Sequence, residues 1–339
     1  MNSKRILISD PSLRDGNHAV AHQITATQVS AYCLRADAAG IPIVEVGHGN
    51  GIGASSLQLG ESASSDRDML TAARAALKTS QLGIHVIPGF ATIEKDLKPA
   101  LDYGVDVFRV AAHCTEADLT DRFISFARNA GKTAYGVLMM SHMASPDVLV
   151  EEAQKMEAYG AEALVIMDSA GYYLPDDVRL RIGKLVDGLN IPVGFHAHNN
   201  LGCAMANSLA AIETGATILD GCSRGFGAGA GNAQLEVVVA VLHRLGYETG
   251  IDLYKMLDLA TYAEENLMDV VPIISSTSVV SGLSGVFSGF LKPANRIAAE
   301  YGVDARDIFF ELGRRGVVAG QEDLILEVAQ DLANLKQVA

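Results

Sequence analysis

The chain has 339 residues, 49% of them hydrophobic and 19% charged, with 26 Lys and Arg against 40 Asp and Glu. This composition is typical of a globular protein and excludes collagen-like and disordered chains. The formal net charge of −14 argues against a broad contact with a phosphate backbone, so nucleic acid is not an expected partner.

The N-terminal segment and the cysteines indicate a compartment. The first apolar run reaches Asp10 too soon for a signal peptide, and no later uninterrupted apolar stretch has the length of a membrane span. The cysteines are scattered without a CxxC pair, which favours buried small side chains in a reducing compartment over disulfides or zinc ligands. We therefore expect a soluble, cytoplasmic protein that does not bind a membrane.

Short runs rich in β-forming residues alternate with helical segments along the first two thirds of the chain. The runs are ILISDPSL (6–13), IVEVGHG (43–49), LGIHVIPG (82–89), VFRVAAH (107–113), TAYGVLMMS (133–141), ALVIMDSAG (163–171), IPVGFHAH (191–198) and TILDGCSRG (217–225). They are nearly continuous in apolar residues, as is typical of strands covered on both faces. After the first run, Thr25 and Gln28 form a candidate capping box, and Gly40 is expected to end that helix.

Eight strand–helix units in about 245 residues match the size of a (β/α)8 barrel. The alternative is a doubly wound open sheet, which usually has about five or six such strands and a glycine-rich turn after the first. Here the first strand ends in LRDGNH, so the sequence favours an α/β fold of the TIM-barrel type.

The remaining residues break this alternation and contain amphipathic helical patterns. We expect residues 1–249 to form a TIM-barrel catalytic domain and residues 250–339 to form a mainly helical C-terminal region. That region is expected to cover part of the barrel mouth and to provide a communication or partner surface.

Histidines concentrate where the predicted strands end. Seven of the nine do so, namely His18, His22, His48, His113, His142, His196 and His198, whereas His85 and His243 fall elsewhere. In a TIM barrel the C-terminal ends of the strands carry the active site. A single histidine at such a place is most often structural, but seven together indicate a functional centre.

The pair His196 and His198 is the sharpest signal in the sequence. Side chains two residues apart on a strand point the same way, so both imidazoles can reach one point. Two imidazoles and one carboxylate form a site for a divalent ion that leaves positions open for substrate. Asp15, which follows the first strand, is the favoured carboxylate, and Asp168 at the end of the sixth strand is the alternative.

The segment GFGAGAGNA (225–233) follows the eighth strand. Loops at this place in barrels often bind phosphate, but no Walker-type lysine follows. We favour a tight turn that brings the backbone and Asn232 close to the metal site.

Several motifs together resemble the 4-hydroxy-2-oxovalerate aldolases, which are class II pyruvate aldolases of the DRE-TIM metallolyase superfamily. The motifs are LRDGNH near the N-terminus, HCTEAD (113–118), LMMSHM (138–143), HAHNN (196–200), GAGAGNA (227–233) and GQED (320–323). The resemblance runs nearly end to end. The RDG and HxH motifs are shared across the superfamily, whereas HCTEAD, LMMSHM and GAGAGNA are typical of the aldolases.

The resemblance implies a carbon–carbon lyase of aromatic hydrocarbon catabolism. Its expected reaction is the retro-aldol cleavage of 4-hydroxy-2-oxopentanoate, or a related 4-hydroxy-2-keto acid, to pyruvate and acetaldehyde or a related aldehyde, together with the reverse addition. It also implies that Asp15, His196 and His198 bind Mn²⁺, or Co²⁺ or Mg²⁺ in its place. The aldehyde of such enzymes is commonly passed through a tunnel to a bound acylating aldehyde dehydrogenase, which is therefore an expected partner.

The resemblance also assigns roles around the substrate. Arg14 resembles the arginine that stabilises the enolate, His18 the base on the 4-hydroxyl group, and Ser169 the serine close to the bound keto acid. His196 is expected to contact the substrate as well. One position departs from the family pattern, because Phe287 stands where a tyrosine is typical. Either the change is tolerated, or the enzyme has looser stereocontrol at C4 or accepts another aldehyde.

Two other functions remain open at this point. An acyl-CoA lyase or Claisen-type synthase of the same superfamily shares RDG and HxH, but the aldolase motifs fit it less well. A scaffold subunit for a dehydrogenase is an interpretation of another class, and only Phe287 favours it. An intact set of Arg14, Asp15, His18 and the two strand histidines argues against a scaffold.

Overall fold

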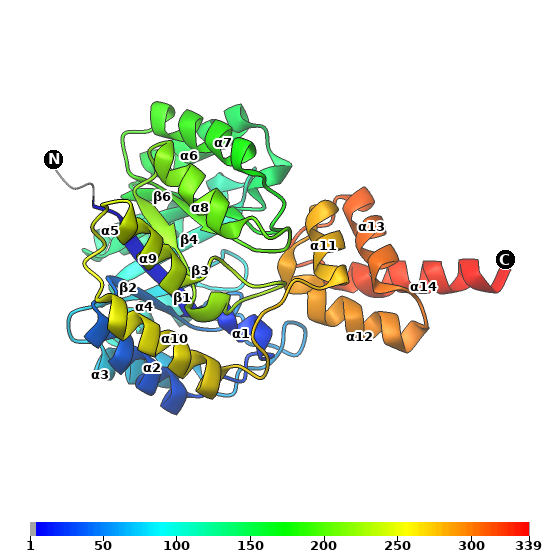
Figure 1. Cartoon of the computed structure of the whole chain (residues 1–339), viewed down its shortest axis with the longest axis horizontal. Coiled ribbons are helices and arrows are strands. Elements are labelled where there is room, and N and C mark those ends of the chain that lie inside the picture. The colour runs from blue at the N-terminus through cyan, green and yellow to red at the C-terminus, as the bar shows by residue number, and fades with distance from the viewer. Residues whose placement is uncertain (1–4, 339) are drawn as a thin grey trace.

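Eight parallel strands close into a barrel in the computed structural model, which describes residues 5–338 (Figure 1). Residues 1–4 of the N-terminal segment discussed above, and Ala339, lie outside the described residues. The strands are β1 (Leu7–Leu13), β2 (Ile43–Val46), β3 (Gln81–Val86), β4 (Val107–His113), β5 (Thr133–Met139), β6 (Ala163–Asp168), β7 (Val193–Ala197) and β8 (Ile218–Asp220). Each strand pairs with its neighbour in chain order, and β8 closes the ring on β1. The predicted (β/α)8 barrel is therefore confirmed, and the open doubly wound sheet is wrong.

The short helix α1 (Gly16–Ala19) follows β1 at the mouth of the barrel. The helices that cover the outside of the barrel are α2 (Ala26–Ala39), α3 (Asp66–Ala76), α4 (Lys98–Asp102), α5 (Asp121–Asn129), α6 (Pro146–Ala158), α7 (Pro175–Gly188), α8 (Ala204–Glu213) and α9 (Leu235–Arg244). The capping box predicted at Thr25 and Gln28 is present at the start of α2, and Gly40 ends that helix in the left-handed conformation.

The inside of the barrel is layered. Near the N-terminal ends of the strands, Ile43, Val107 and Ile218 belong to an apolar cluster. Two residues further along the same strands, Glu45, Arg109 and Asp220 are fully buried. Because alternate strand residues point to the same side, a charged layer lies directly above the apolar one.

The C-terminal helices form a second cluster that projects from one side of the barrel (Figure 1). Helix α10 (Leu253–Leu267) lies against α2 of the barrel, and the helices beyond it have a hydrophobic core of their own. These helices are α11 (Ser276–Leu283), α12 (Leu291–Tyr301), α13 (Ala305–Arg315) and α14 (Asp323–Val338). The division of the chain at residues 249 and 250 stays a prediction.

The C-terminal region reaches the mouth of the barrel through backbone contacts. The N–H of Ser288 donates to the carbonyl of Ser169 at 2.9 Å, and the His142 ring is hydrogen-bonded to the carbonyl of Gly285 at 2.8 Å. Within residues 5–338, no helix combines the length and the apolar character that crossing a bilayer requires.

Candidate active site

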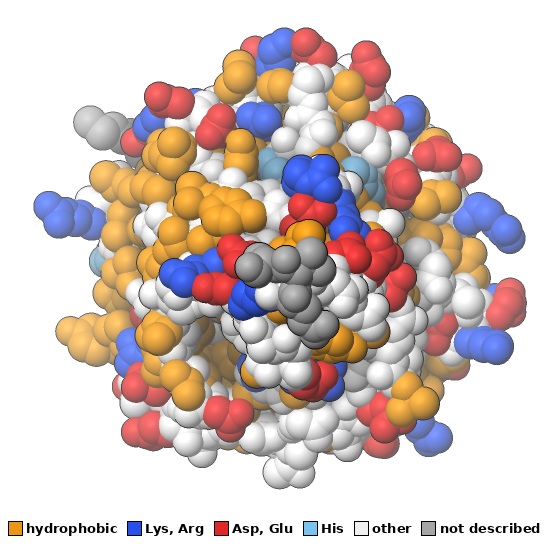
Figure 2. Space-filling view, turned by 90° about the vertical axis from the view of Figure 1, so that its right-hand side faces the viewer, with side chains coloured by type: hydrophobic (Ala, Val, Ile, Leu, Met, Phe, Trp, Pro, Cys, Tyr) orange, Lys and Arg blue, Asp and Glu red, His pale blue; other side chains and the backbone are white. Residues whose placement is uncertain are grey.

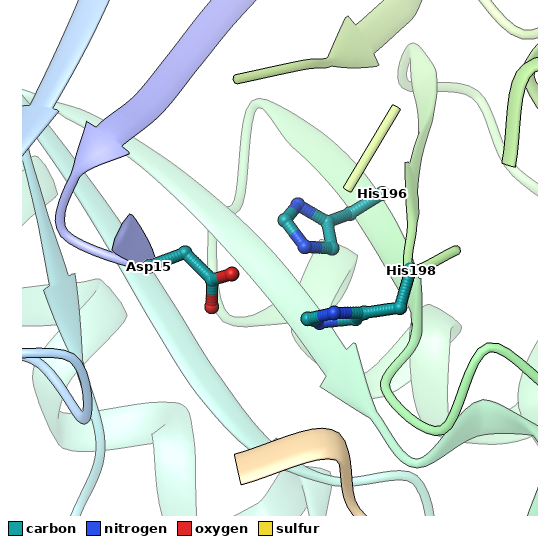
Figure 3. Close-up of side chains that lie close together, drawn as sticks. All are labelled: Asp15, His196 and His198. Carbon is teal, nitrogen blue, oxygen red and sulfur yellow. The ribbon is translucent and has the colours of Figure 1, made fainter. Parts of the chain in front are cut away.

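Asp15, His196 and His198 converge at the mouth of the barrel (Figure 3). Asp15 directly precedes α1, His196 lies on β7, and His198 follows that strand. One potential ligand atom from each residue lies within 4.8 Å of those of the other two, and all three side chains are buried. The structure thus brings together the three residues that the sequence singled out, although Asp15 and the two histidines are about 180 residues apart in the chain.

The free ring nitrogens of both histidines fit a metal ion. His196 Nε2 and His198 Nδ1 are buried and have no hydrogen-bond partner among the described residues. Buried polar atoms of this kind are rare unless water, an ion or a ligand satisfies them. Two imidazoles and a carboxylate are a donor set that suits divalent transition metals.

The orientation of His196 follows from its contact with Asp220. His196 Nδ1 lies 2.9 Å from Asp220 Oδ2. Burial raises the pKa of Asp220, but the charge of Arg109 and the contact with His196 lower it by more, so its pKa lies below the ordinary value. This carboxylate is therefore ionised and only accepts hydrogen bonds. The proton of the imidazole therefore lies on Nδ1, and the lone pair of Nε2 faces Asp15.

Asp15 is held as a carboxylate. Its Oδ2 accepts hydrogen bonds from the Asn232 side chain at 2.7 Å and from the Ala228 N–H at 3.1 Å. Burial raises the pKa of Asp15, but the charges of Arg14 and His198 lower it more, and the result is a pKa well below the usual range. The carboxylate is therefore available as a ligand at neutral pH.

Asp168, the alternative carboxylate, does not belong to this group. Its two oxygens accept hydrogen bonds from the N–H groups of Tyr172 and Tyr173, at 2.8 and 3.1 Å. Burial raises its pKa to about 7. Its position at the end of β6 made it the alternative carboxylate for the metal site, but its side chain instead closes the turn that follows the strand.

Arg14 presents an unused donor to the site. Its Nε donates to Glu45 and its Nη1 to Asp15 Oδ1 at 2.8 Å, whereas its buried Nη2 has no partner within the described chain. A guanidinium with a free Nη2 group, fixed beside a carboxylate that faces the metal position, is placed to donate to an oxygen of a bound ligand.

His18 lies on α1, half-buried, with its ring nearly perpendicular to that of Phe287 at a centroid distance of 6.2 Å. Burial lowers the pKa of His18, so its imidazole is neutral at pH 7 and can accept a proton. His18 also lines a cavity of about 240 Å³ that lies between the barrel and the C-terminal region, together with Ala228 and Lys292.

The other histidines of the barrel rim have different partners. The rings of His22 and His48 stack with their centroids 3.6 Å apart, and each has a ring nitrogen hydrogen-bonded to the backbone. His113 is hydrogen-bonded to Thr115, and His142 contacts the C-terminal region. Of the seven histidines at the rim, only His196 and His198 form with Asp15, within the described chain, a group that could hold a metal ion, and the rim position alone did not distinguish them.

Ser169 follows β6 at the mouth of the barrel, and Phe287 lies against His18. Ser169 Oγ accepts a hydrogen bond from the Met140 N–H at 2.9 Å, which leaves its own hydroxyl hydrogen free to donate. Phe287 lines a second cavity, of about 460 Å³, together with His113 and Gln321.

The glycine-rich segment makes the tight turn that the sequence favoured. It brings Ala228 and Asn232 into contact with Asp15. A Cβ atom at Gly227 would overlap with both Asp15 and Asn232. Only glycine fits at this close approach of the backbone to the site.

Three residues of the site were missed in the sequence: Glu45, Arg109 and Asp220. Glu45 contacts Arg14, Asp220 contacts His196, and Arg109 contacts both carboxylates. The signal was present, because each is a charged residue within an otherwise apolar strand. A buried charge is costly unless it is paired, so three of them in one barrel indicate a network.

Comparisons with known proteins agree with this geometry. The family model described as HMGL-like matches residues 5–262, and that of the DmpG-like communication domain matches residues 272–334. The chain is 65% identical to the 4-hydroxy-2-oxovalerate aldolase of Pectobacterium atrosepticum over 98% of its own length and 96% of the relative's. It is equally identical to the aldolase of the same name from Spirochaeta aurantia, over 98% and 97% of the two chains.

Solved structures show the same fold at low identity. The carboxyl transferase domain of Rhizobium etli pyruvate carboxylase, solved with pyruvate and biocytin, matches with a TM-score of 0.83 and 17% identity over 98% of this chain and 61% of that one. The N-terminal domain of a putative aldolase from Bacteroides vulgatus matches with a TM-score of 0.71 and 22% identity, over 87% and 97%. The full-length relatives, the two family models and the closed barrel together show that the chain is an enzyme, a carbon–carbon lyase, and belongs to the 4-hydroxy-2-oxovalerate aldolase family.

Proposed function

We propose that this aldolase cleaves 4-hydroxy-2-oxopentanoate, or a closely related 4-hydroxy-2-keto acid, to pyruvate and an aldehyde, and also catalyses the reverse addition. The relatives at 65% identity are named for this substrate. The observation that carries the proposal is the convergence of Asp15, His196 and His198, with the free N–H of Arg14 beside them.

The reaction depends in this proposal on a divalent ion, held by Asp15, His196 and His198. Mn²⁺ is the ion we propose, and Co²⁺ and Mg²⁺ are the alternatives for the same donors. When bound, such an ion supplies a Lewis acid beside the carboxylate and keto oxygens of a 2-keto acid.

Arg14 and His18 have complementary tasks. Breaking the C3–C4 bond leaves its electron pair on the pyruvate fragment, as an enolate with negative charge on the keto oxygen. The free N–H of Arg14 would donate to that oxygen, where the charge develops. The neutral imidazole of His18 would take the proton of the 4-hydroxyl group as that oxygen becomes the carbonyl of the aldehyde, and C3 is then protonated to give pyruvate.

Ser169, His196 and Phe287 complete the proposed substrate pocket. The free hydroxyl hydrogen of Ser169 suits a carboxylate or keto oxygen of the acid. His196 would contact the acid from the metal position, and Phe287 lines the cavity that extends toward the C-terminal region. We propose that the aldehyde end of the substrate lies toward Phe287.

A dehydrogenase is the proposed partner. The match of residues 272–334 to a communication domain supports this proposal. Figure 2 views the molecule from the end that carries the C-terminal helices, where hydrophobic side chains gather on one side of a face of mixed charge. Leu283, Phe310 and Leu326 of these helices are large apolar residues exposed to solvent. An acylating aldehyde dehydrogenase would bind to such a surface and consume the released aldehyde in its own active site.

The test is pyruvate release from racemic 4-hydroxy-2-oxopentanoate, coupled to NADH consumption by lactate dehydrogenase. Metal-stripped protein is expected to be inactive and to recover on addition of Mn²⁺. Release that does not depend on a metal would contradict the metal proposal. Absence of release from this and from longer 4-hydroxy-2-keto acids, with cleavage of a thioester instead, would favour an acyl-CoA lyase. Absence of both would favour a scaffold subunit.

A further inference from the structure

Arg109 is the largest fully buried side chain of the protein among the described residues, and it lies at the centre of the barrel. Its Nη2 donates to Asp220 Oδ2 at 2.6 Å, and its Nη1 lies 3.0 Å from Glu45 Oε2. Nη1 also donates to the hydroxyl of Ser9 at 3.1 Å. One guanidinium thus joins two carboxylates from strands on either side of β1.

Each of these carboxylates holds a different part of the active site. Asp220 accepts the hydrogen bond from His196 Nδ1 at 2.9 Å, which fixes the ring with Nε2 toward Asp15. Glu45 accepts a hydrogen bond from Arg14 Nε, which fixes the guanidinium with Nη2 toward the same space. Arg109 itself lies below the metal position, in the layer of Glu45 and Asp220.

The charges of this group explain why a cation is needed at Arg109. The side chains of Asp15, Glu45 and Asp220 are negative, and those of Arg14 and Arg109 are positive. The group therefore carries one net negative charge, which a divalent ion converts to one positive charge, the complement of a keto acid with one carboxylate. Without Arg109, three buried carboxylates would face a single arginine, and unpaired buried carboxylates protonate or move.

We infer that Arg109 is a positioning residue that acts on both halves of the reaction centre, through Asp220 on the metal ligand His196 and through Glu45 on Arg14. This inference rests on the proposed function. Arginine is suited to the task because its planar fork donates a hydrogen bond to Asp220 with one nitrogen and forms an ion pair with Glu45 through the other, whereas lysine offers a single point charge. Residues that orient a metal ligand in this way typically change metal affinity by about 10- to 100-fold when mutated.

The experiment measures the Kd of Mn²⁺ by electron paramagnetic resonance of the free ion, together with kcat at saturating Mn²⁺. The full-length variants are Arg109→Lys, Asp220→Asn and Glu45→Gln. For Arg109→Lys we expect the Kd of Mn²⁺ to rise about 10- to 100-fold and kcat to stay reduced at saturating metal. Asp220→Asn is expected to act mainly on the Kd of Mn²⁺, and Glu45→Gln mainly on kcat.

Arg74→Lys is the matched control. Arg74 forms an ion pair with Asp106 at 2.7 Å, outside the active site. Replacing it is expected to lower the thermal midpoint without changing the Kd of Mn²⁺. If Arg109 has a purely structural role, Arg109→Lys will also lower the thermal midpoint without changing the Kd of Mn²⁺. That result would overturn the inference.

Two further outcomes are decisive. If Arg109→Lys does not fold, the other two variants decide. A raised Kd of Mn²⁺ in Asp220→Asn together with a lowered kcat in Glu45→Gln would support the inference. Wild-type values of both constants would overturn it. If the wild-type protein binds no Mn²⁺, the proposed function fails and the inference fails with it. If the wild-type protein binds Mn²⁺ and Arg109→Lys binds it with the same Kd, the inference is overturned while the proposed function stands.

Discussion

The ring of Phe287 stands nearly perpendicular to that of His18, at an interplanar angle of 84° and a centroid distance of 6.2 Å. Phe287 belongs to the C-terminal region and His18 to the barrel, so the two parts of the chain meet at the proposed base. Each ring borders a different cavity. The proposed function puts the aldehyde end of the substrate beside the side chain at position 287.

Phe287→Tyr should raise the discrimination between the C4 enantiomers of 4-hydroxy-2-oxopentanoate. The new hydroxyl adds a polar group that hydrogen-bonds one configuration at C4 better than the other, an effect of about 1–3 kcal/mol in a closed site. Pyruvate released from each pure enantiomer gives the ratio of kcat/KM values. Phe287→Leu is the control, because it removes the ring without adding a hydroxyl group. An enantiomer ratio that Phe287→Tyr leaves unchanged would show that the family tyrosine is dispensable for stereocontrol.

His18→Ala should lower kcat by about 10²- to 10⁴-fold, as is typical of the loss of a general base. The affinity for pyruvate should change little, because a base acts in the transition state rather than in ground-state binding. Steady-state kinetics and inhibition by pyruvate separate the two effects. His243→Ala, on the outer helix α9 and exposed, should leave both values unchanged. A change confined to KM in His18→Ala would mean that His18 only positions the substrate.

The fold could be predicted from the sequence because its signals are local and repeated. The apolar runs appear as strands within a few residues of the expected bounds, and the capping box at Thr25 marks the start of α2 as expected. The eighth strand is much shorter than its apolar run, since only Ile218–Asp220 form it. The chain then turns into the glycine-rich segment, whose course is set by its contacts with Asp15 and not by local propensity.

The site could be predicted only in part. His196 and His198 are two residues apart, so their shared direction follows from strand geometry alone. The contacts of Arg109 with Glu45 and Asp220 join residues 64 and 111 positions apart, and no local pattern encodes them. What the sequence does show is a charge within each of three apolar strands, and such charges require partners.

Gly227→Ala should weaken metal binding without unfolding the barrel. A methyl group at this position would overlap with Asp15 and Asn232, so the carboxylate or the turn must move. The expected result is at least a 10-fold rise in the Kd of Mn²⁺, on the scale of about 10- to 100-fold seen when groups that orient ligands change. Gly183→Ala is the control, because there the methyl group would lie 3.2 Å from the flexible side chain of Thr214 on the outside of the barrel. Equal affinities in the two variants would contradict the close approach.

Asp10 should make the stability of the protein depend on pH. It is fully buried, and Tyr32 donates a hydrogen bond to it at 2.6 Å. Burial raises its pKa to about 6, from an ordinary value of 3.8. The folded protein thus binds the proton more tightly than the unfolded chain does. The stabilisation by Asp10 is complete below about pH 4 and is lost as the pH rises through about 6, a change of about 3 kcal/mol.

The difference in the free energy of unfolding between the wild-type protein and Asp10→Asn isolates this effect, since asparagine does not titrate. Urea unfolding is measured between pH 2 and pH 7, and between pH 4 and pH 7 the wild-type protein should lose stability relative to the variant. Asp37→Asn is a control of opposite sign, because three backbone N–H groups hold the pKa of Asp37 at about 2. Its stabilisation is present above about pH 4 and is lost as the pH falls toward 2. Parallel pH profiles of the wild-type protein and Asp10→Asn would refute the prediction.

The most direct test of the central claim is calorimetric titration of metal-stripped wild-type protein and Asp15→Ala with Mn²⁺, with pyruvate release measured in the same samples. Asp15 supplies one of three converging donors and is also hydrogen-bonded to Asn232, so its loss should abolish tight binding and turnover together while the barrel stays folded. One Mn²⁺ bound per wild-type chain, with activity that follows occupancy, is the expected result. Unaltered Mn²⁺ affinity in Asp15→Ala would contradict the proposed metal centre.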